Sequence, residues 1–343
     1  MNTKASPLIK LNNVTKEFPY DRSFFGYNKS LKAVNDISLE IVPGEILALV
    51  GESGCGKTTT GRLILNLESL TSGDIIYKDK SRSDFQDEDW KEYRQKVQVV
   101  FQNSKASLNP RKNIANIMRS ALICSGIMDK NDKQAIKERI LQLLNDVGLK
   151  PAEKFLSKYP NELSGGQRQR IGIARALATE PEFIVADEPV SALDVSVKSQ
   201  VLRSLQKLQT ERGLAFLFIS HELTVVRSVA DRIAVMYLGK IVEIGTNDQV
   251  FEKQIHPYTE SLVSSTPIPN PEKTRNKERI ILSGSVPSPK NPPSGCHFHP
   301  RCFYAKEICS KKVPSLEEIE SGHQVSCHFA KERFDNRNQG GNL

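Results

Sequence analysis

The residues with the most distinctive chemistry in this chain form a glycine-rich segment between Gly51 and Thr58. Their order, Gly-Glu-Ser-Gly-Cys-Gly-Lys-Thr, fits the pattern G-x-x-x-x-G-K-[ST]. Glycines at these places let backbone N–H groups wrap phosphate oxygens, and a helix starting behind them adds positive potential. Lys57 is expected to reach the β- and γ-phosphates, and Thr58 to ligate Mg²⁺. The pattern predicts a nucleoside triphosphate site. Its residues are Gly51, Glu52, Ser53, Gly54, Cys55, Gly56, Lys57, Thr58 and Thr59.

Two adjacent carboxylates, Asp187 and Glu188, follow the apolar run 183–186. Such a run is typical of a buried strand, and ligands of open α/β sheets bind beyond the carboxyl ends of the strands. We expect Asp187 to hold Mg²⁺, directly or through water, and Glu188 to polarise the attacking water as general base. The pair predicts hydrolysis of the bound nucleotide.

A third segment, Leu163 to Gln167, reads Leu-Ser-Gly-Gly-Gln and opens a helical stretch. A serine and two glycines at a helix N-terminus form an anion-binding nest. Taken alone, Ser-Gly-Gly is more typical of a flexible turn. Its place ahead of the carboxylate pair, with Arg168 and Arg170 continuing the helix, favours the anion-binding interpretation.

These groups need a scaffold of strands that alternate with helices. Fully apolar runs at 46–50, 183–186 and 214–219 predict buried strands, and residues 113–149, 165–178 and 194–211 are helical in pattern. Apolar strands alternating with helices favour a mainly parallel sheet covered on both faces. Beyond about Pro257 the chain becomes rich in proline, and residues 287–293 are typical of an extended linker.

At this point the sequence strongly resembles the ATP-binding cassette (ABC) ATPases, with residues 163–167 similar to their signature motif. The resemblance implies an α/β P-loop ATPase with a RecA-like core, an antiparallel β subdomain, a helical subdomain at about 103–178 and a small Cys-rich C-terminal extension. It also implies that two such subunits pack head to tail, so that each signature caps the partner's phosphate loop. The nucleotide contacts implied for the signature are Ser164, Gly165, Gly166 and Gln167.

Further motifs take their meaning from this resemblance. Gln102 is similar to the Q-loop glutamine that senses Mg²⁺ and the attacking water, and residues 191–194, ending in Asp194, are similar to the D-loop at the dimer interface. His221 is similar to the switch histidine on the γ-phosphate. The implied catalytic residues are Glu188, His221 and Gln102, and the Mg²⁺ ligands are Thr58, Gln102 and Asp187.

Adenine stacking is expected from an aromatic side chain near the N-terminus. Phe18 is the first candidate and Tyr20 the second, and the insert 24–27, Phe-Phe-Gly-Tyr, offers rivals.

Composition excludes several other classes of protein. The chain has 343 residues, 38% apolar and 26% charged, which excludes collagen-like, disulfide-scaffold and wholly disordered proteins. No run approaches the roughly 18 apolar residues of a membrane-spanning helix, and the start lacks the apolar core of a signal peptide. We therefore expect a membrane role only through partners. The net charge of +8 could suggest nucleic acid or an anionic membrane face as a partner, but surplus surface lysine is the simpler interpretation, so charge does not decide the function. No nucleic-acid partner is predicted.

A narrower resemblance is carried by the segments 101–111, 187–196, 256–259 and 292–296. They are similar to the ATPases of bacterial oligopeptide and dipeptide importers, and closest to the F-type subunit. At Asn103-Ser104 the chain departs from the Asp-Pro common in that family. The implied partners are a paralogous D-type ATPase in a heterodimer, two transmembrane permease subunits and, indirectly, an extracytoplasmic solute-binding protein. The implied location is the cytoplasmic face of the cell membrane, where the subunit is peripheral.

Four cysteines gather near the C-terminus, at Cys296, Cys302, Cys309 and Cys327. Clustering of this kind in a reducing compartment favours a metal or cluster site over disulfides. The spacing fits neither a zinc ribbon nor a ferredoxin run, so spacing alone leaves a metal site and free thiols both open. The importer family implies a [4Fe–4S] cluster on these thiolates. Zinc and an empty site remain alternatives, and four histidines lie in the same stretch: His297, His299, His323 and His328.

The domain division expected is an ABC ATPase domain at 1–256, the importer extension with its four cysteines at 257–335 and a tail at 336–343. The predicted function is hydrolysis of MgATP that powers uptake of oligopeptides or dipeptides through partner permeases. A first alternative keeps the motor and changes the cargo to a nickel chelate, glutathione, haem or a sugar. More distant alternatives are a soluble ABC ATPase acting on nucleic acid or ribosomes, and an iron–sulfur regulator without a transport role.

Overall fold

The computed structural model describes residues 6–22, 28–102, 107–191, 193–266 and 279–338. The insert 24–27, Asn103-Ser104, Ala192 and the tail residues 339–343 lie outside this part of the chain. The chain forms two compact units. The first unit is built mainly from residues 77–219 and the second from residues 10–40, 47–76 and 220 onward.

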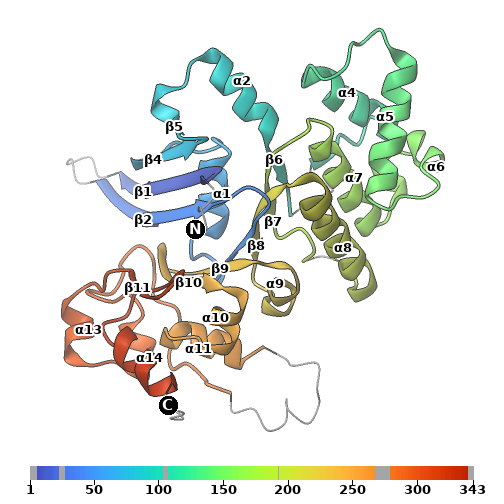
Figure 1. Ribbon diagram of the computed structural model, residues 1–343. Coiled ribbons are helices and arrows are strands. Elements are labelled where there is room, and N and C mark those ends of the chain that lie inside the picture. The colour runs from blue at the N-terminus through green and yellow to red at the C-terminus, as the bar shows by residue number, and fades with distance from the viewer. Residues whose placement is uncertain (1–5, 23–27, 103–106, 192, 267–278, 339–343) are drawn as a thin grey trace. The chain divides into compact units, whose positions relative to one another are not determined.

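Three parallel strands form the centre of the first unit, in the order β8–β7–β6. They are β6 (Val97–Val100), β7 (Phe183–Asp187) and β8 (Ala215–Ser220). The register places Val100 opposite Ala186 and Asp187 opposite Ile219, so the carboxyl ends meet at one edge. Nearly every residue of β7 and β8 is buried, as expected for strands covered on both faces. Figure 1 shows helices α7 and α8 beside these strands.

Helices account for most of the remaining first unit, where α4, α5 and α7 pack together and α7 also contacts β6 and α8. The strand β5 (Lys80–Ser81) also belongs to it. The helices are η1 (Arg82–Asp84), α2 (Asp87–Lys96), α4 (Ile114–Cys124), α5 (Lys133–Asp146), α6 (Glu153–Leu156), η2 (Pro160–Glu162), α7 (Gly165–Leu177) and α8 (Val195–Arg212).

The helical pattern at 113–149 is in fact two helices rather than one. The chain leaves α4 after Cys124, and Gly126 takes a left-handed backbone with φ of 74°. Asp132 then caps the start of α5, because its carboxylate accepts a hydrogen bond from the N–H of Ala135 at 3.0 Å. Because the apolar periodicity continues through both segments, the sequence pattern does not indicate the break between α4 and α5.

The second unit contains two sheets. One has the strand order β2–β1–β4, from β1 (Ile9–Arg22), β2 (Asn28–Ile41) and β4 (Ser72–Tyr77). The other has the order β11–β12–β10–β9–β3. Its strands are β3 (Ile46–Val50), β9 (Arg232–Tyr237), β10 (Lys240–Thr246), β11 (Glu317–Glu320) and β12 (His323–Val325). Only β3 and β9 are parallel, and the pairs from β9 to β11 are antiparallel.

The cysteine-containing end of the chain is therefore built into this second sheet. Strand β12 pairs with β10, with Val325 opposite Glu243. A buried apolar cluster of Ile255, Val325 and Ala330 lies at the same place. The remaining helices of the unit are α1 (Lys57–Ile64), α9 (Leu223–Val229), α10 (Asn247–Glu252), α11 (Pro257–Ser264), η3 (His299–Arg301), α13 (Glu307–Lys311) and α14 (Ala330–Asn338).

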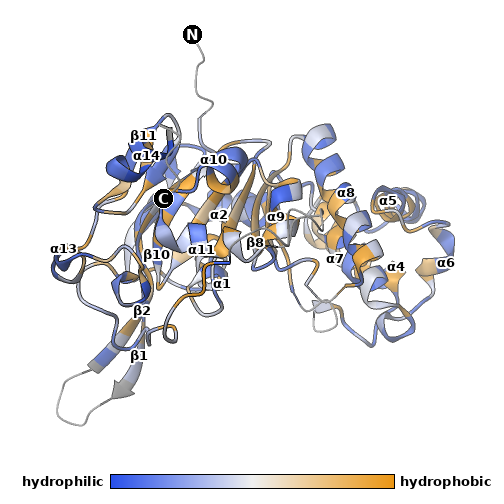
Figure 2. Ribbon diagram, turned by 90° about the horizontal axis from the view of Figure 1, so that it is seen from below, coloured by the Kyte–Doolittle hydropathy of each residue, from blue (hydrophilic) through white to orange (hydrophobic). Residues whose placement is uncertain are grey.

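Hydropathy follows this division into strands and covering helices. Figure 2 shows hydrophobic residues on strand β8 and a mainly hydrophilic α5. Within the described ranges, we find no helix with both the length and the apolar character needed to cross a membrane.

Candidate nucleotide site

The glycine-rich loop lies between β3 and α1, as the motif requires. Gly51 and Gly56 have φ of 150° and 111°, values that other residues rarely adopt. A Cβ on Gly51 would lie 2.1 Å from the carbonyl oxygen of Met236, and a Cβ on Gly56 would lie 2.2 Å from that of Ala33. Both positions therefore exclude any side chain, because neighbouring backbone closes on them.

Lys57 is folded onto the loop to which it belongs. The residue is 6% exposed, and its ammonium group donates to the carbonyl oxygens of Gly51 at 2.7 Å and Glu52 at 3.0 Å. Its nitrogen also lies 3.6 Å from the sulfur of Cys55. Burial raises the pKa of the Cys55 thiol, so this side chain acts as a small apolar filler at neutral pH.

Glu52, the second residue of the loop, has partners that the sequence pattern did not reveal. Its backbone N–H donates to the hydroxyl of Tyr258 at 2.8 Å. Its carboxylate accepts two hydrogen bonds from Arg301, at 2.8 and 3.1 Å. The sequence carries only a faint signal for these contacts: residues 256–259 and the cysteine segment are distinctive, but nothing in their spacing points to residue 52.

In the first unit, the structure brings Gln102 and Glu188 together. Although 86 residues separate them, the side-chain amide of Gln102 donates to the Glu188 carboxylate at 2.5 Å. Glu188 follows the end of β7 and has a left-handed backbone with φ of 46°. Its N–H donates to the carbonyl of Ile219 at 2.9 Å, which ties this turn to the neighbouring strand. A strained backbone held in this way is common where a side chain must be aimed.

The segment 164–167 forms a capping box at the start of α7. The Ser164 hydroxyl accepts from the N–H of Gln167 at 3.2 Å, and the Gln167 side chain accepts from the N–H of Ser164 at 3.0 Å. Gly166 is required by packing, since a Cβ there would lie 2.3 Å from a methyl carbon of Val197. Further along α7, Gln169 donates to the carbonyl of Phe101 at 3.3 Å, which links this helix to the residue before Gln102.

The other predicted nucleotide residues occupy these places. Asp194 is exposed just before α8, and His221 is exposed just after β8. Phe18 lies half-buried on β1, where the Lys16 ammonium sits 4.8 Å from its ring centroid. Tyr20 donates its hydroxyl to the carbonyl of Lys290 at 3.3 Å. The roles assigned to these residues stay predictions, as do those of Asp187, Thr58 and Thr59.

The four C-terminal cysteines line one small cavity of about 20 Å³, room for about one water molecule. Burial raises the pKa of Cys296 to about 11 and that of Cys302 to about 12, and it also raises the pKa of Cys327. Across the described parts of the chain, no group of three or more His, Cys, Asp or Glu side chains is arranged to hold a metal ion. The cavity is also lined by His256, Pro257, Phe298, His299, Tyr304, His328 and Phe329.

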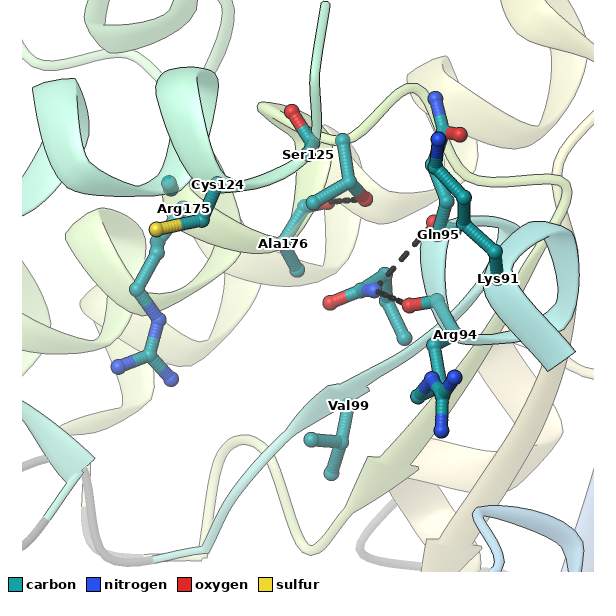
Figure 3. Close-up of a pocket in the computed structure, with 11 residues that line it drawn as sticks. Lys91, Arg94, Gln95, Val99, Cys124, Ser125, Arg175 and Ala176 are labelled. Carbon is teal, nitrogen blue, oxygen red and sulfur yellow. Dashed lines mark hydrogen bonds between the residues drawn. The ribbon is translucent and has the colours of Figure 1, made fainter. Parts of the chain in front are cut away.

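A larger cavity of about 470 Å³ lies in the first unit, among α2, β6, α4 and α7. Figure 3 shows Lys91, Arg94 and Gln95 across it from Cys124 and Arg175. Its charged lining is entirely cationic: Lys91, Arg94 and Arg175. Arg175 also donates to the carbonyl of Ser107.

Solved structures define the class to which this fold belongs. The chain is similar to the ATP-binding cassette MJ0796, solved as a dimer bound to ADP and Pi, with a TM-score of 0.62, 30% identity, and coverage of 70% of this chain and 98% of that one. It is also similar to cbiO1 of Clostridium perfringens, described as part of the ABC transporter complex cbiONQ, with a TM-score of 0.60, 25% identity, and coverage of 73% and 92%. The predicted ABC ATPase fold is confirmed.

Sequence comparison gives the family. Residues 34–191 match the ABC transporter family, and residues 242–309 match the family described as "Oligopeptide/dipeptide transporter, C-terminal region". The oligopeptide transport ATP-binding protein AppF of Bacillus subtilis is 44% identical over 94% of this chain and 97% of its own length. The dipeptide transport ATP-binding protein DppF of Escherichia coli is 43% identical over 97% of both chains.

The chain belongs to the family of ATP-binding subunits of oligopeptide/dipeptide ABC transporters. It is thus an ABC ATPase, an ATP hydrolase coupled to transport that uses ATP and Mg²⁺. Membership also implies permease subunits as partners.

Proposed function

We propose that this chain is the F-type motor subunit of an importer of oligopeptides or dipeptides. The observation that supports the motor role is the contact between Gln102 and Glu188 at the edge where β7 ends. A glutamine amide that donates to this carboxylate orients it, and a carboxylate held at such an edge can act as the general base for the attacking water. The cargo is supported by the relatives, which are named as oligopeptide and dipeptide transport proteins.

The roles proposed within the nucleotide site follow the chemistry of each group. Residues 51–59, with Lys57, hold the phosphates, and Thr58, Asp187 and Gln102 hold Mg²⁺. Glu188 is the general base, and His221 contacts the γ-phosphate. Phe18 stacks on adenine. Ser164, Gly165, Gly166, Gln167 and Asp194 complete the site of the partner ATPase.

Uptake measurements test the cargo directly. Cells that carry this protein as their only copy should accumulate a labelled tri- or tetrapeptide, and cells carrying Glu188→Gln should not. If cells with the wild type and cells with Glu188→Gln take up the peptide equally, the proposal of peptide import is wrong. The cargo would then be another solute, such as a nickel chelate, glutathione, haem or a sugar.

We further propose that the subunit works on the cytoplasmic face of the membrane, in a heterodimer with a D-type ATPase and on two permeases served by a solute-binding protein. The segment 101–111 and the adjoining cavity are the proposed permease contact. Arg175 supports this, because it lines the cavity and also bonds to Ser107 within that segment.

A native thiol makes this contact testable. Cys124 is exposed and lines the same cavity. A thiol-specific crosslinker should join this chain to a permease in membranes, and Cys124→Ser should abolish that product. Crosslinking that persists in the variant would place the permease elsewhere. Purification of the assembly would show whether the second ATPase is a paralogue or another copy of this chain.

For the domains, we propose the division 1–256, 257–335 and 336–343. In this division the region 257–335 is an extension attached to the cassette, and the pairing of β12 with β10 supports that attachment.

The four thiols are the proposed ligands of a [4Fe–4S] cluster. The chemistry of the side chains supports this proposal, because Cys296, Cys302, Cys309 and Cys327 line one cavity without any carboxylate, and soft thiolates suit iron–sulfur clusters and zinc. When bound, such a cluster would join four chain positions covalently and so stabilise a small region.

Metal analysis separates the alternatives. Protein purified without oxygen should contain iron and sulfide in equal amounts, and Cys302→Ser should lose both. Cys124→Ser, which changes a cysteine outside the cavity, should retain them. Stoichiometric zinc, or no metal at all, would contradict the cluster assignment.

A further inference from the structure

The phosphate loop is held from outside by two residues of the C-terminal region. Arg301 and Glu52 lie 249 residues apart and form a two-pronged ion pair, at 2.8 and 3.1 Å. Pairs with two parallel N–H···O bonds are the most directional that arginine makes. Tyr258 adds the second restraint through the Glu52 N–H, at 2.8 Å. Because Lys57 bonds to the carbonyl of the same residue, every polar group of Glu52 is engaged.

Arg301 is itself held rigidly. The residue is 8% exposed, and its guanidinium lies 6.0 Å from the ring centroid of Tyr237, whose hydroxyl accepts a bond at 3.4 Å. The rings of Tyr237, Tyr258 and Phe298 pack on one another, with centroids 4.7 to 5.4 Å apart. A buried and pre-positioned arginine loses little side-chain entropy on pairing, so this restraint is stronger than that of a surface salt bridge.

The position of Glu52 makes the pairing matter for nucleotide binding. An anionic side chain within a loop that receives phosphates repels the ligand unless a cation neutralises it. A loop held in its binding conformation also loses less entropy when the ligand arrives. Arg301 supplies both effects, since it neutralises the carboxylate and fixes the residue that carries it.

We propose that Arg301 is a positioning residue for nucleotide binding. Acting through the Glu52 carboxylate, it holds the phosphate loop in its binding conformation, so that ATP affinity depends on the folded C-terminal region. Since Arg301 ends η3, between Cys296 and Cys302, the residue that restrains the loop is carried by the cysteine segment itself. This inference rests on the proposed phosphate-binding role of residues 51–58.

A double-mutant cycle tests the coupling. MgATP affinity is measured by fluorescence of a labelled ATP for the wild type, Arg301→Gln, Glu52→Gln and the double variant. Arg301→Gln should raise the Kd about tenfold, because it leaves the Glu52 carboxylate without its cation. Glu52→Gln should raise the Kd less, because no anionic side chain then remains at this position of the loop. The double variant should bind no more weakly than Arg301→Gln. If the two effects multiply instead, Arg301 does not act through Glu52, and if Arg301→Gln leaves Kd unchanged the proposal is wrong.

A matched arginine separates positioning from general stability. Arg333 is also buried in the C-terminal region, where it bonds to the carbonyl of Ile255 at 2.7 Å and to Glu260 at 2.6 Å. Arg333→Gln should lower Tm by about as much as Arg301→Gln, yet change the Kd for MgATP by less than about twofold. An equal loss of affinity in both variants would reduce the role of Arg301 to stability alone.

Two further variants keep the test decisive. Arg301→Lys keeps the charge without the two-pronged geometry, so its Kd should fall between those of the wild type and Arg301→Gln. This variant also serves if Arg301→Gln does not fold. Lys57→Ala tests the underlying phosphate site separately. If Lys57→Ala binds MgATP normally, the assignment of the loop fails, whatever Arg301 does.

Discussion

The phosphate loop and the carboxylate edge are shaped in different ways. The conformation of the loop depends on glycines that lie close together in the chain. Gly51 and Gly56 adopt backbone angles that glycine accepts more readily than other residues, and the neighbouring backbone leaves no room for a side chain at either position. The edge is instead assembled from distant residues, because Gln102 meets Glu188 only after β6 and β7 pair. Substitutions should therefore act on the loop through local strain and on the edge through lost chemistry.

The largest effect is expected at the carboxylate edge. Glu188→Gln removes the general base while keeping the shape of the side chain, so ATP turnover should fall about 10²- to 10⁴-fold. Binding of MgATP should persist, because the loop is untouched. Steady-state hydrolysis and labelled-ATP binding measure the two properties. Near-normal hydrolysis would remove Glu188 from the proposed mechanism.

A change in the loop should act on folding first. Gly56→Ala places a Cβ against the carbonyl of Ala33, and we expect it to lower the free energy of unfolding by about 2–4 kcal/mol. Gly54→Ala is the matched control, since φ there is also positive but no atom lies within 4 Å of the added Cβ. It should cost only about 1–2 kcal/mol. Equal losses in denaturant titrations would mean that close packing does not shape this loop.

Gln102 provides a finer test of the edge. Gln102→Ala frees the Glu188 carboxylate from its amide partner, so hydrolysis should fall about tenfold, less than for loss of the base itself. Gln98→Ala is a suitable control, because Gln98 bonds to backbone carbonyls of Arg94 and Gln95 instead. If both variants hydrolyse ATP at the same rate, the contact with Glu188 has no part in turnover.

The smallest effect is expected at the start of α7. Ser164→Ala removes the helix-capping hydroxyl and should lower the free energy of unfolding by about 1 kcal/mol. Ser164→Asp should retain the cap. Its carboxylate would nevertheless weaken ATP-dependent dimerisation if this segment completes the partner's site, which sedimentation in the presence of ATP would show. Unchanged dimerisation by Ser164→Asp would argue against that role.

Much of the architecture was predictable, because buried parallel strands are apolar throughout and helices keep a regular apolar spacing. The strands at 183–186 and 214–219 and the helix of the signature segment were predicted and are present. The break between α4 and α5 was not, since the apolar period continues across it. Pairing of β12 with β10 was also missed, because three residues carry too short a pattern to indicate a strand.

The sequence by itself determined the phosphate loop, the family and the order of the motifs, because each is recognised from residues close together in the chain. The loop also depends on backbone angles that glycine adopts most readily. Only the tertiary structure decided which groups meet across long separations. It set Gln102 on Glu188, Arg301 on Glu52, and four cysteines around one cavity. Spacing along a chain carries no information about such pairs, because the distance between them is set by strand register and core packing.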